Sequence, residues 1–426
     1  MASGEGKQPG QSRGPFRALR RVPFRRFYLG QAVSSSGTFL QQTALGWLVL
    51  RQTHSPADLG LVFAAGSLPS LVLGPWGGVV ADRFNLRPLL VCTQITSAML
   101  AGALWLAAER GQASLTVIVV IGVLSGLVQV LDSPARQAFV AVLVPPEDLS
   151  SAVSLNGVVV NTSRVVGPAV AGIMIATVGT TPCFAANAAS YVAVIVALLT
   201  VHPLDVAVAR GTGRAGGVLQ ALRYAASRQQ LWLPLAMMAV VGLLAFNFSV
   251  VLPVLVQKVF KEGGGTYGLL AATLSIGSII GSLGVGLIRH PHRVYLAAAA
   301  CAFGVSLVGV ALAPSVATAA VALAVTGAAA FSFVTLTSTT LQLHTAAAFR
   351  GRIMALFILV YVGTTPIGSS LTGWICAAFG ARTDLLVGAA GCLVAGMGAF
   401  LVRTPPNPDA PLTDLIGTGQ LEHPLR

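Results

Sequence analysis

Charged residues are scarce in this chain of 426 residues: Asp, Glu, Lys and Arg make up only 9% of it. Soluble domains carry about 25% of charged residues, so a chain of this composition cannot cover its surface with polar groups. The mean hydropathy of +0.80 indicates instead that the solvent is a lipid bilayer. The long apolar runs lack the alternation of transmembrane β-strands. The predicted class is therefore an all-α integral membrane protein.

Signatures of catalysis and of metal or nucleotide binding are also missing. The sequence has no Gly-Lys-Ser/Thr phosphate loop, and its five cysteines show no Cys-x-x-Cys spacing. His290 and His292 have no acidic residue close by in the sequence. We therefore predict no enzyme, no cofactor and no metal. The net charge of +13 sits mostly in loops, which favours a role in membrane orientation over nucleic-acid binding.

Twelve apolar segments are each long enough to cross a bilayer. The longest polar stretch, about 202–230, divides them into six plus six, and its part 218–224 is predicted to be an amphipathic helix on the membrane face. The predicted spans are 27–50, 58–81, 88–108, 115–141, 150–178, 183–202, 231–257, 266–288, 294–313, 316–343, 352–378 and 384–402. The expected parts are an N-terminal arm, a six-helix bundle, a central loop, a second six-helix bundle and a C-terminal tail: 1–26, 27–202, 203–230, 231–402 and 403–426.

Basic residues are distributed unevenly between the two sides of the predicted membrane protein. An even number of spans puts both termini on one side, which holds 19 Lys and Arg residues against five on the other. Because cytoplasmic loops carry an excess of Lys and Arg, both termini are expected in the cytoplasm. The expected location is the inner (plasma) membrane, with many passes.

A weak internal repeat supports two matched halves. Gly60 opens the second span and Gly78 ends it, while Gly268 opens the eighth and Gly286 ends it, at a constant offset of 208 residues. Paired halves of this kind are typical of alternating-access carriers.

A charged turn follows the second span, with the pattern Gly78-x-x-x-Asp82-Arg83-x-x-x-Arg87. It cannot lie in hydrocarbon, so we expect a short loop, with Gly78 allowing close helix packing. Asp82 is expected to cap a helix end or to pair with Arg136, holding the two bundles shut on the cytoplasmic side. The alternative is a solvated loop charge that only sets topology.

This motif resembles the signature between the second and third helices of the major facilitator superfamily. Two further stretches are similar to the branch that contains the enterobactin exporter and related efflux proteins: Asp132-Ser-Pro-Ala-Arg136, and Asn161-Thr-Ser-Arg164-Val-Val-Gly167-Pro168-x-x-x-Gly172. The resemblance covers about residues 20–405. It implies a fold of twelve helices in two pseudo-symmetric bundles of six around a central cavity.

The charged residues within the spans, Asp132, Arg136 and Arg164, are the main candidates for a role in the transport mechanism. Asp132 and Arg136 share one helical face at i, i+4, so they either neutralise each other or form a relay with Asp82. Arg164 lies about 20 Å into its span, where a charge must face a cavity or a partner. Asp132 is the obvious carboxylate at similar depth. The pair is either a structural ion pair or a coupling site, in which protonation of Asp132 releases Arg164.

Several polar and aromatic residues are candidates for a substrate cavity, because the resemblance implies that their spans line one. They are Gln41, Gln42, Asn161, Phe246 and Asn247. The alternative role for the amides is interhelical hydrogen bonding. Gly167, Pro168 and Gly172 are expected to pack helices.

The resemblance implies secondary active export of small amphipathic, drug-like or siderophore-like molecules by alternating access, and we expect this export to be coupled to protons by antiport. Arg164 would suit an acidic group on the substrate. The expected partners are the small molecule, protons and the lipid bilayer, with no nucleic acid, and the expected state is a monomer. An importer or uniporter on the same fold stays open, as does an intramembrane enzyme or a receptor from another class.

Overall fold

The structure is a computed structural model that describes residues 17–81, 83–201, 217–286, 293–346 and 349–402. These residues are almost entirely helical. The elements in chain order are η1 (Arg17–Arg20), α1 (Val22–Thr53), α2 (Pro56–Ala81), α3 (Leu86–Glu109), α4 (Leu115–Val142), η2 (Pro146–Asp148), α5 (Leu149–Thr177), α6 (Thr181–Thr200), α7 (Gly217–Ala226), α8 (Gln229–Ala245), α9 (Phe248–Val254), η3 (Leu255–Phe260), α10 (Gly264–Val285), α11 (Arg293–Ala311), α12 (Val316–Leu343), α13 (Arg350–Gly363), α14 (Thr365–Ala378) and α15 (Ala381–Leu401).

The predicted fold class is confirmed, since each of the twelve expected spans is helical. Eleven described segments are long and apolar enough to cross a membrane. Helix α1, with 32 residues, also has the length but is more polar. Its polar residues Gln31, Ser34 and Ser35 are buried, because α1 packs on α5 and α6 inside the protein.

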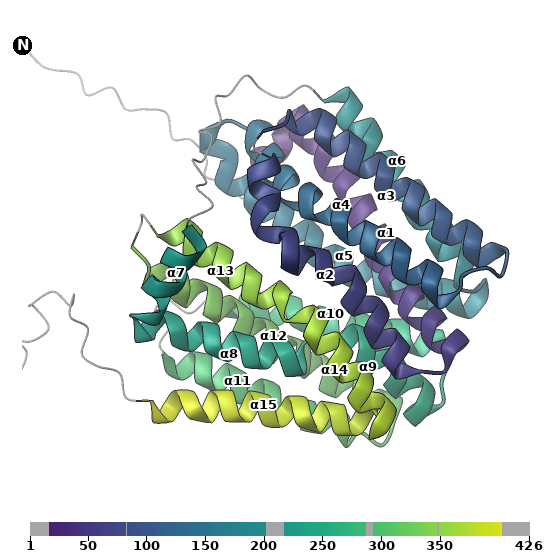
Figure 1. The fold of residues 1–426 in the computed structure, drawn as a ribbon, viewed down its shortest axis with the longest axis vertical. Coiled ribbons are helices and arrows are strands. Elements are labelled where there is room, and N and C mark those ends of the chain that lie inside the picture. Colours follow the sequence, from purple (N-terminus) through teal and green to yellow (C-terminus); the bar gives the residue numbers. More distant parts are fainter. Residues whose placement is uncertain (1–16, 82, 202–216, 287–292, 347–348, 403–426) are drawn as a thin grey trace, which may run out of the picture.

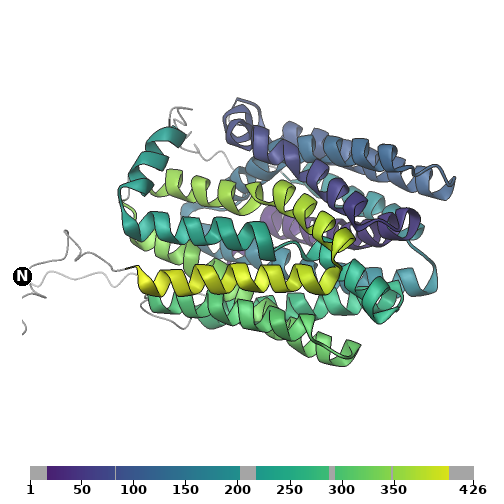
Figure 2. The same cartoon turned by 60° about the horizontal axis from the view of Figure 1, so that its bottom comes forward.

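The helices form two groups that meet along one long interface (Figure 1). In the first group α1 packs on α5 and α6, α2 on α4, and α3 on α4 and α6. In the second group α10 packs on α12, and α11 on α12 and α15, while α15 also contacts α8. The second view shows α15 lying along the outside of the second group (Figure 2).

Two of the expected spans are broken helices instead of continuous ones. The segment predicted at 231–257 is helix α8, a break at Phe246 and Asn247, helix α9 and the π-helix η3. The segment at 352–378 is interrupted at Thr364, between α13 and α14. Pro366 follows this second interruption, and proline has no N–H with which to continue a helical ladder. Hydropathy alone does not reveal such breaks, because both halves are apolar.

The two groups make their closest contacts at one end of the molecule, which we call the closed end. Here α2 crosses α14 and α5 crosses α10. A Cβ on Gly60 would lie 3.0 Å from the Cα of Gly373, and one on Gly268 would lie 2.6 Å from the Pro168 carbonyl oxygen and would overlap Gly172. Gly60 and Gly268 are related by the offset of 208, so the repeat corresponds to two equivalent crossings.

The two groups diverge toward the opposite end, where α7 lies at the left of Figure 1. Four glycines there, in the same helices or the same span as the closed-end glycines, have no heavy atom within 4 Å of an added Cβ: Gly74, Gly157, Gly284 and Gly351. Helix α7 covers the segment expected to be amphipathic, and Tyr224 on it stacks on Phe349 with ring centroids 4.3 Å apart.

Candidate functional site

A cavity of about 250 Å³ lies between the two groups of helices. Helices α1, α5, α9, α10, α12 and α13 and the break before α9 all contribute to its wall. The lining residues are Phe39, Gln42, Thr43, Arg164, Pro168, Phe246, Phe248, Ser249, Leu252, Tyr267, Ala271, Leu274, Ser275, Ser278, Phe331 and Tyr361. The wall is thus aromatic and hydroxylated, and Arg164 is its one charged residue.

The guanidinium of Arg164 contacts an aromatic ring from each of the two groups of helices. Its central carbon lies 5.7 Å from the centroid of Phe39 on α1 and 5.1 Å from that of Phe331 on α12. Cation–π contacts of this kind contribute about 0.5–2 kcal/mol each. They stabilise the cation but leave its N–H groups available for an acceptor in the cavity.

The rest of the aromatic wall is a connected cluster at the break in the seventh span. The ring of Phe246 packs edge-on against Phe331 and Tyr361, with centroids 6.3 Å and 5.7 Å away. Tyr361 also stacks on Phe357. Phe246 itself lies at the break, where residues 246 and 247 are not helical, and it lines the cavity together with Phe331 and Tyr361.

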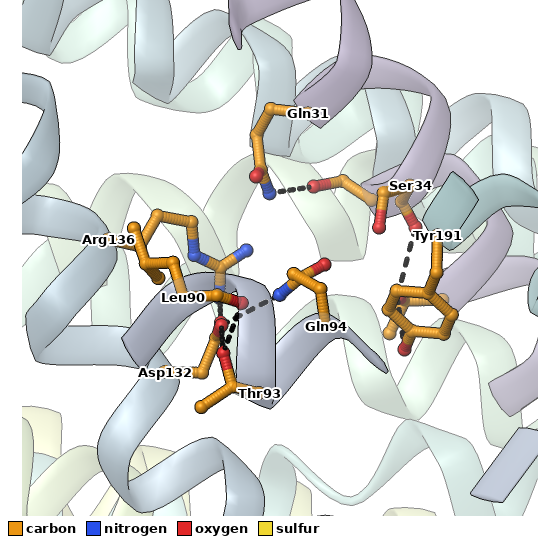
Figure 3. A network of polar contacts seen from close by, with 10 residues as sticks. Gln31, Ser34, Leu90, Thr93, Gln94, Asp132, Arg136 and Tyr191 are labelled. Carbon is orange, nitrogen blue, oxygen red and sulfur yellow. Dashed lines mark hydrogen bonds and ion pairs between the residues drawn. The ribbon is translucent and has the colours of Figure 1, made fainter. Parts of the chain in front are cut away.

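Asp132 does not form the ion pair with Arg164 that we expected. Its carboxylate pairs with Arg136 one turn away, at 2.7 Å, and accepts hydrogen bonds from Thr93 at 2.8 Å and Gln94 at 2.7 Å (Figure 3). This network joins α3 to α4 inside the first group. Both carboxylate oxygens of Asp132 therefore have hydrogen-bond or ion-pair partners without Arg164. Arg164 lines the cavity instead.

The charged turn after α2 is described only in part. Asp82 lies outside the described residues, and Gly78 lies in the last turn of α2. Arg83 is exposed. Arg87 donates to the carbonyl oxygens of Leu198 at 2.7 Å and Leu199 at 2.6 Å.

Arg87 therefore caps the carboxyl-terminal end of α6, where a positive charge is favourable. Arg293 makes the corresponding contact in the second half, since it donates to the Phe400 carbonyl oxygen near the end of α15 at 3.1 Å. Arg136, the expected partner of Asp82, is engaged within its own helix group.

The cavity candidates from the sequence divide into two sets. Gln42 and Phe246 line the cavity. Gln41 accepts a hydrogen bond from Asn187 of α6 at 2.7 Å, and Asn161 is half-buried one turn before Arg164, outside the lining. Asn247 is buried and faces a second, smaller cavity.

The glycine–proline stretch of α5 lies in close helix contacts. A Cβ on Gly167 would lie 2.8 Å from the Leu40 nitrogen of α1, and one on Gly172 would lie 2.9 Å from the Gly268 Cα of α10. Pro168 lines the cavity between these two contacts. The close approaches at Gly167 and Gly172 are of the kind that helix packing requires, whereas Pro168 belongs to the cavity wall.

Sequence reasoning missed two buried carboxylates. Asp384 in the first turn of α15 is only 5% exposed. Asp148 pairs with Arg17 at 2.7 Å and Arg21 at 3.1 Å, and so ties η1 and the start of α1 to α5. A signal was present in both cases, because each acid stands at the start of a long apolar run.

Comparison with known proteins identifies the family. The family model described as "Transmembrane secretion effector" matches residues 13–422. The staphyloferrin A transporter of Staphylococcus aureus is 25% identical over 361 residues, which cover 83% of this chain and 89% of that protein. The multidrug efflux pump Tap of Mycolicibacterium fortuitum is 25% identical over 405 residues, covering 90% and 97%. The enterobactin exporter EntS of Citrobacter koseri is 26% identical over 400 residues, covering 91% and 96%.

Solved structures agree on the fold. The nucleoside transporter NupG superposes with a TM-score of 0.74 at 11% identity, over 90% of this chain and 100% of that one. A bacterial homologue of the lysosomal transporter Spinster, in an inward-facing and unoccupied conformation, gives 0.72 at 14% identity, over 89% and 97%. Family and fold are those of transporters, and the chain belongs to the major facilitator superfamily, in the branch of transmembrane secretion effectors.

Proposed function

We propose that the chain exports small amphipathic molecules that carry an acidic group, by alternating access and in exchange for protons. The observation that carries the proposal is Arg164, the one charged residue in the wall of an aromatic cavity between the two helix groups. A charge within a membrane protein is costly, about 2.5–3.5 kcal/mol on insertion scales, and such residues commonly mark a substrate pathway.

The chemistry of the wall favours this class of substrate. Phe39 and Phe331 make cation–π contacts with the guanidinium, and an acid in the cavity gains a charge-assisted hydrogen bond from it. The surrounding rings accept an apolar or aromatic body, and hydroxyls such as Ser275 and Ser278 offer further hydrogen bonds. A cationic drug would meet an unfavourable charge in the same cavity.

The relatives support export as the direction. Those named above are a staphyloferrin A transporter, a multidrug efflux pump and an enterobactin exporter. We therefore propose a drug-like or siderophore-like acid as the substrate of this chain.

Alternating access requires two rigid parts that rock about the substrate. We propose that residues 27–202 and 231–402 are these parts, joined by the segment 203–230 and flanked by the arm 1–26 and the tail 403–426. At the closed end the helix crossings at Gly60 and Gly268 shut the cavity on that side of the membrane. With both termini in the cytoplasm of the plasma membrane, as the distribution of Lys and Arg predicts, the closed end faces outward and the cavity is reached from the cell interior.

The charged turn after α2 is our proposed closure at the opposite end. When the two groups meet there, Gly78 would allow close packing, and Asp82 and Arg83 would contact the partner bundle, while Arg87 and the Asp132–Arg136 pair hold the turn on its own bundle. In the described state the glycines at this end, among them Gly74 and Gly351, have no heavy atom within 4 Å of an added Cβ, which is consistent with an open cytoplasmic side.

The test uses two dyes of similar shape and opposite charge in everted membrane vesicles. Fluorescein is a xanthene with a carboxylate, and pyronin is a xanthene cation. We expect the chain to accumulate fluorescein when a proton gradient is applied and to move pyronin far less. Loss of accumulation when the gradient is collapsed would support proton coupling, and uptake without any gradient would indicate a uniporter.

Variants of Arg164 connect this flux to the site. Arg164→Gln removes the charge, and a hydrogen bond to a charged group contributes about 1.5–3 kcal/mol, so the KM for fluorescein should rise roughly 10- to 100-fold. Arg164→Lys keeps the charge and should retain more of the transport. Equal transport of both dyes by the wild type, or an unchanged KM in Arg164→Gln, would contradict the proposal.

A further inference from the structure

A second, much smaller cavity lies beside the break in the seventh span. Its volume is about 10 Å³, close to the room that one water-sized particle occupies. Two polar side chains line it, the carboxylate of Asp384 and the amide of Asn247. Apolar residues make up the rest, among them Leu244, Val251 and Leu307.

The described residues provide no basic partner for Asp384. Their ion pairs are made by Asp148 and Asp132 and none involves Asp384. The hydroxyl of Thr372 in α14 donates a hydrogen bond to the Asp384 carboxylate. A carboxylate charge buried in this way costs several kcal/mol unless a cation joins it.

The charged and titratable groups near Asp384 come from three elements. Cys376 of α14 interacts electrostatically with both Asp384 and Lys258 of η3. Arg382 of α15 is directed elsewhere and donates to the Ala313 carbonyl oxygen at 3.1 Å. Helices α8, α9 and α11 contribute only aliphatic residues to the small cavity. No ion pair joins Lys258 or Arg382 to Asp384 among the described residues, which leaves its carboxylate free to take a cation from solution.

The end of α8 at the break has an electrostatic potential that favours a cation. Helix α8 ends at Ala245, and its last carbonyls lose their helical donors there. Asn247 donates to the Leu243 oxygen at 2.8 Å, whereas Leu244 and Ala245 line the small cavity. The carboxyl-terminal end of a helix attracts cations, and broken membrane helices use such ends to bind Na⁺ or protons.

We propose that Asp384, Asn247 and the end of α8 form the binding site of the coupling cation, a proton or Na⁺. The proposal rests on the transport function proposed above and assigns the cation to the second helix group. Asp132 is the weaker candidate, because any cation there must displace Arg136 from a carboxylate that already has three partners.

The site is connected to the substrate cavity through the break. Phe246 and Phe248, on either side of Asn247, line the large cavity. The Asn247 oxygen also accepts from Ser369 of α14 at 3.5 Å. Occupation of the small site therefore acts on the backbone that carries the cavity's aromatic wall.

The site is also connected to the closed end. Thr372, which binds Asp384, precedes Gly373, which meets Gly60 of α2 at the crossing of α2 and α14. A bound cation makes burial of Asp384 favourable and so stabilises the closed end, and by linkage closure strengthens cation binding. An exporter driven by a cation from outside needs this coupling, because the bound cation must favour the return to the inward-open state.

The test measures closure directly and needs no substrate. Spin labels are attached to cysteines introduced by Ala57→Cys in α2 and Ala377→Cys in α14, both exposed positions, in a full-length chain whose native cysteines are replaced. Double electron–electron resonance in lipid nanodiscs then gives the closed and open populations at acidic and alkaline pH, each with and without Na⁺.

For the wild type we expect the closed-to-open ratio to rise ~10-fold or more with the cation, about 1.4 kcal/mol. A response to acid identifies the proton, and a response to Na⁺ at constant pH identifies Na⁺. Asp384→Asn should be closed in every buffer, whereas Asp384→Glu and the control Glu109→Gln should retain the response. A wild type that ignores both cations, or an Asp384→Asn chain that still responds, would overturn the proposal.

Exchange of fluorescein at equal concentrations across the membrane separates this inference from the transport function. If Asp384→Asn exchanges the dye but no longer concentrates it, the cation site is supported. If the wild type exchanges no fluorescein, the assigned substrate class fails, while the resonance measurement still decides on the cation site.

Discussion

Replacing Gly268 by alanine should open the closed end. Gly268 lies in α10 where it crosses α5, and its backbone is in contact with Gly172 and with the carbonyl oxygen of Pro168. The added methyl group would lie 2.6 Å from that oxygen and 2.7 Å from the Gly172 nitrogen, whereas ordinary contacts begin at 3.4 Å. The two helices must therefore separate by at least roughly 0.8 Å, the difference between 3.4 and 2.6 Å, since the methyl group also overlaps the Gly172 Cα. Backbone atoms cannot yield as a flexible side chain does.

The magnitude follows from the energy of overpacking. Inserting a methyl group into a well-packed contact costs about 1–3 kcal/mol. The cost applies only to the closed conformation, since the helices are apart in the other one. At 1.4 kcal/mol per factor of ten, the closed-to-open ratio should fall about 5- to 150-fold.

The assay is labelling of a cysteine in the cavity, introduced by Ser275→Cys, with a membrane-impermeant thiol reagent added on the side of the closed end. The labelling rate should rise by the same factor in Gly268→Ala. Gly102→Ala in α3 is the matched control, because its methyl group has no heavy atom within 4 Å. An unchanged rate in Gly268→Ala, with normal labelling from the other side, would refute the assignment of this crossing as a closure.

Three further substitutions test contacts inside the first helix group. Asp132→Asn removes the carboxylate charge that binds Arg136, Thr93 and Gln94. The free energy of unfolding, measured by thermal unfolding in detergent, should fall by about 2 kcal/mol relative to Glu109→Gln. Equal melting temperatures of the two variants would rule out a structural role. Asp148→Asn should release η1, and trypsin should then cut at its arginines faster than in the wild type or in the exposed-site control Glu147→Gln; a constant cutting rate would contradict the role of this ion pair. Arg87→Gln removes the cap of α6 and should raise amide hydrogen exchange in the last turn of that helix only. Exchange there at the wild-type rate would contradict the capping role.

Much of the fold could be predicted from residues taken in order. A bilayer requires long apolar segments with internally satisfied backbones, and this requirement acts on each segment separately. The span boundaries and the offset of 208 between Gly60 and Gly268 could therefore be read along the chain. The polarity of α1 was visible too, although its cause, burial against α5 and α6, was not.

Depth in the membrane could also be counted, but direction around a helix axis could not. At 1.5 Å per residue, Asp132 and Arg164 reach similar depths, and we expected them to pair. In the structure Arg136 pairs with Asp132, and Arg164 makes cation–π contacts with Phe39 and Phe331. The preference of Asp132 for its i+4 neighbour was one of the two alternatives that the sequence left open.

The residue order thus established a membrane protein of twelve helices in two matched halves, with a charge deep in the fifth span. Tertiary packing decided that this charge lies in an aromatic cavity, that the seventh span breaks at Asn247, and that Asp384 is buried without a basic partner among the described residues. The reason is physical: solvation by lipid depends on local composition, whereas the partner of a buried polar group depends on how neighbouring helices are rotated and where they cross.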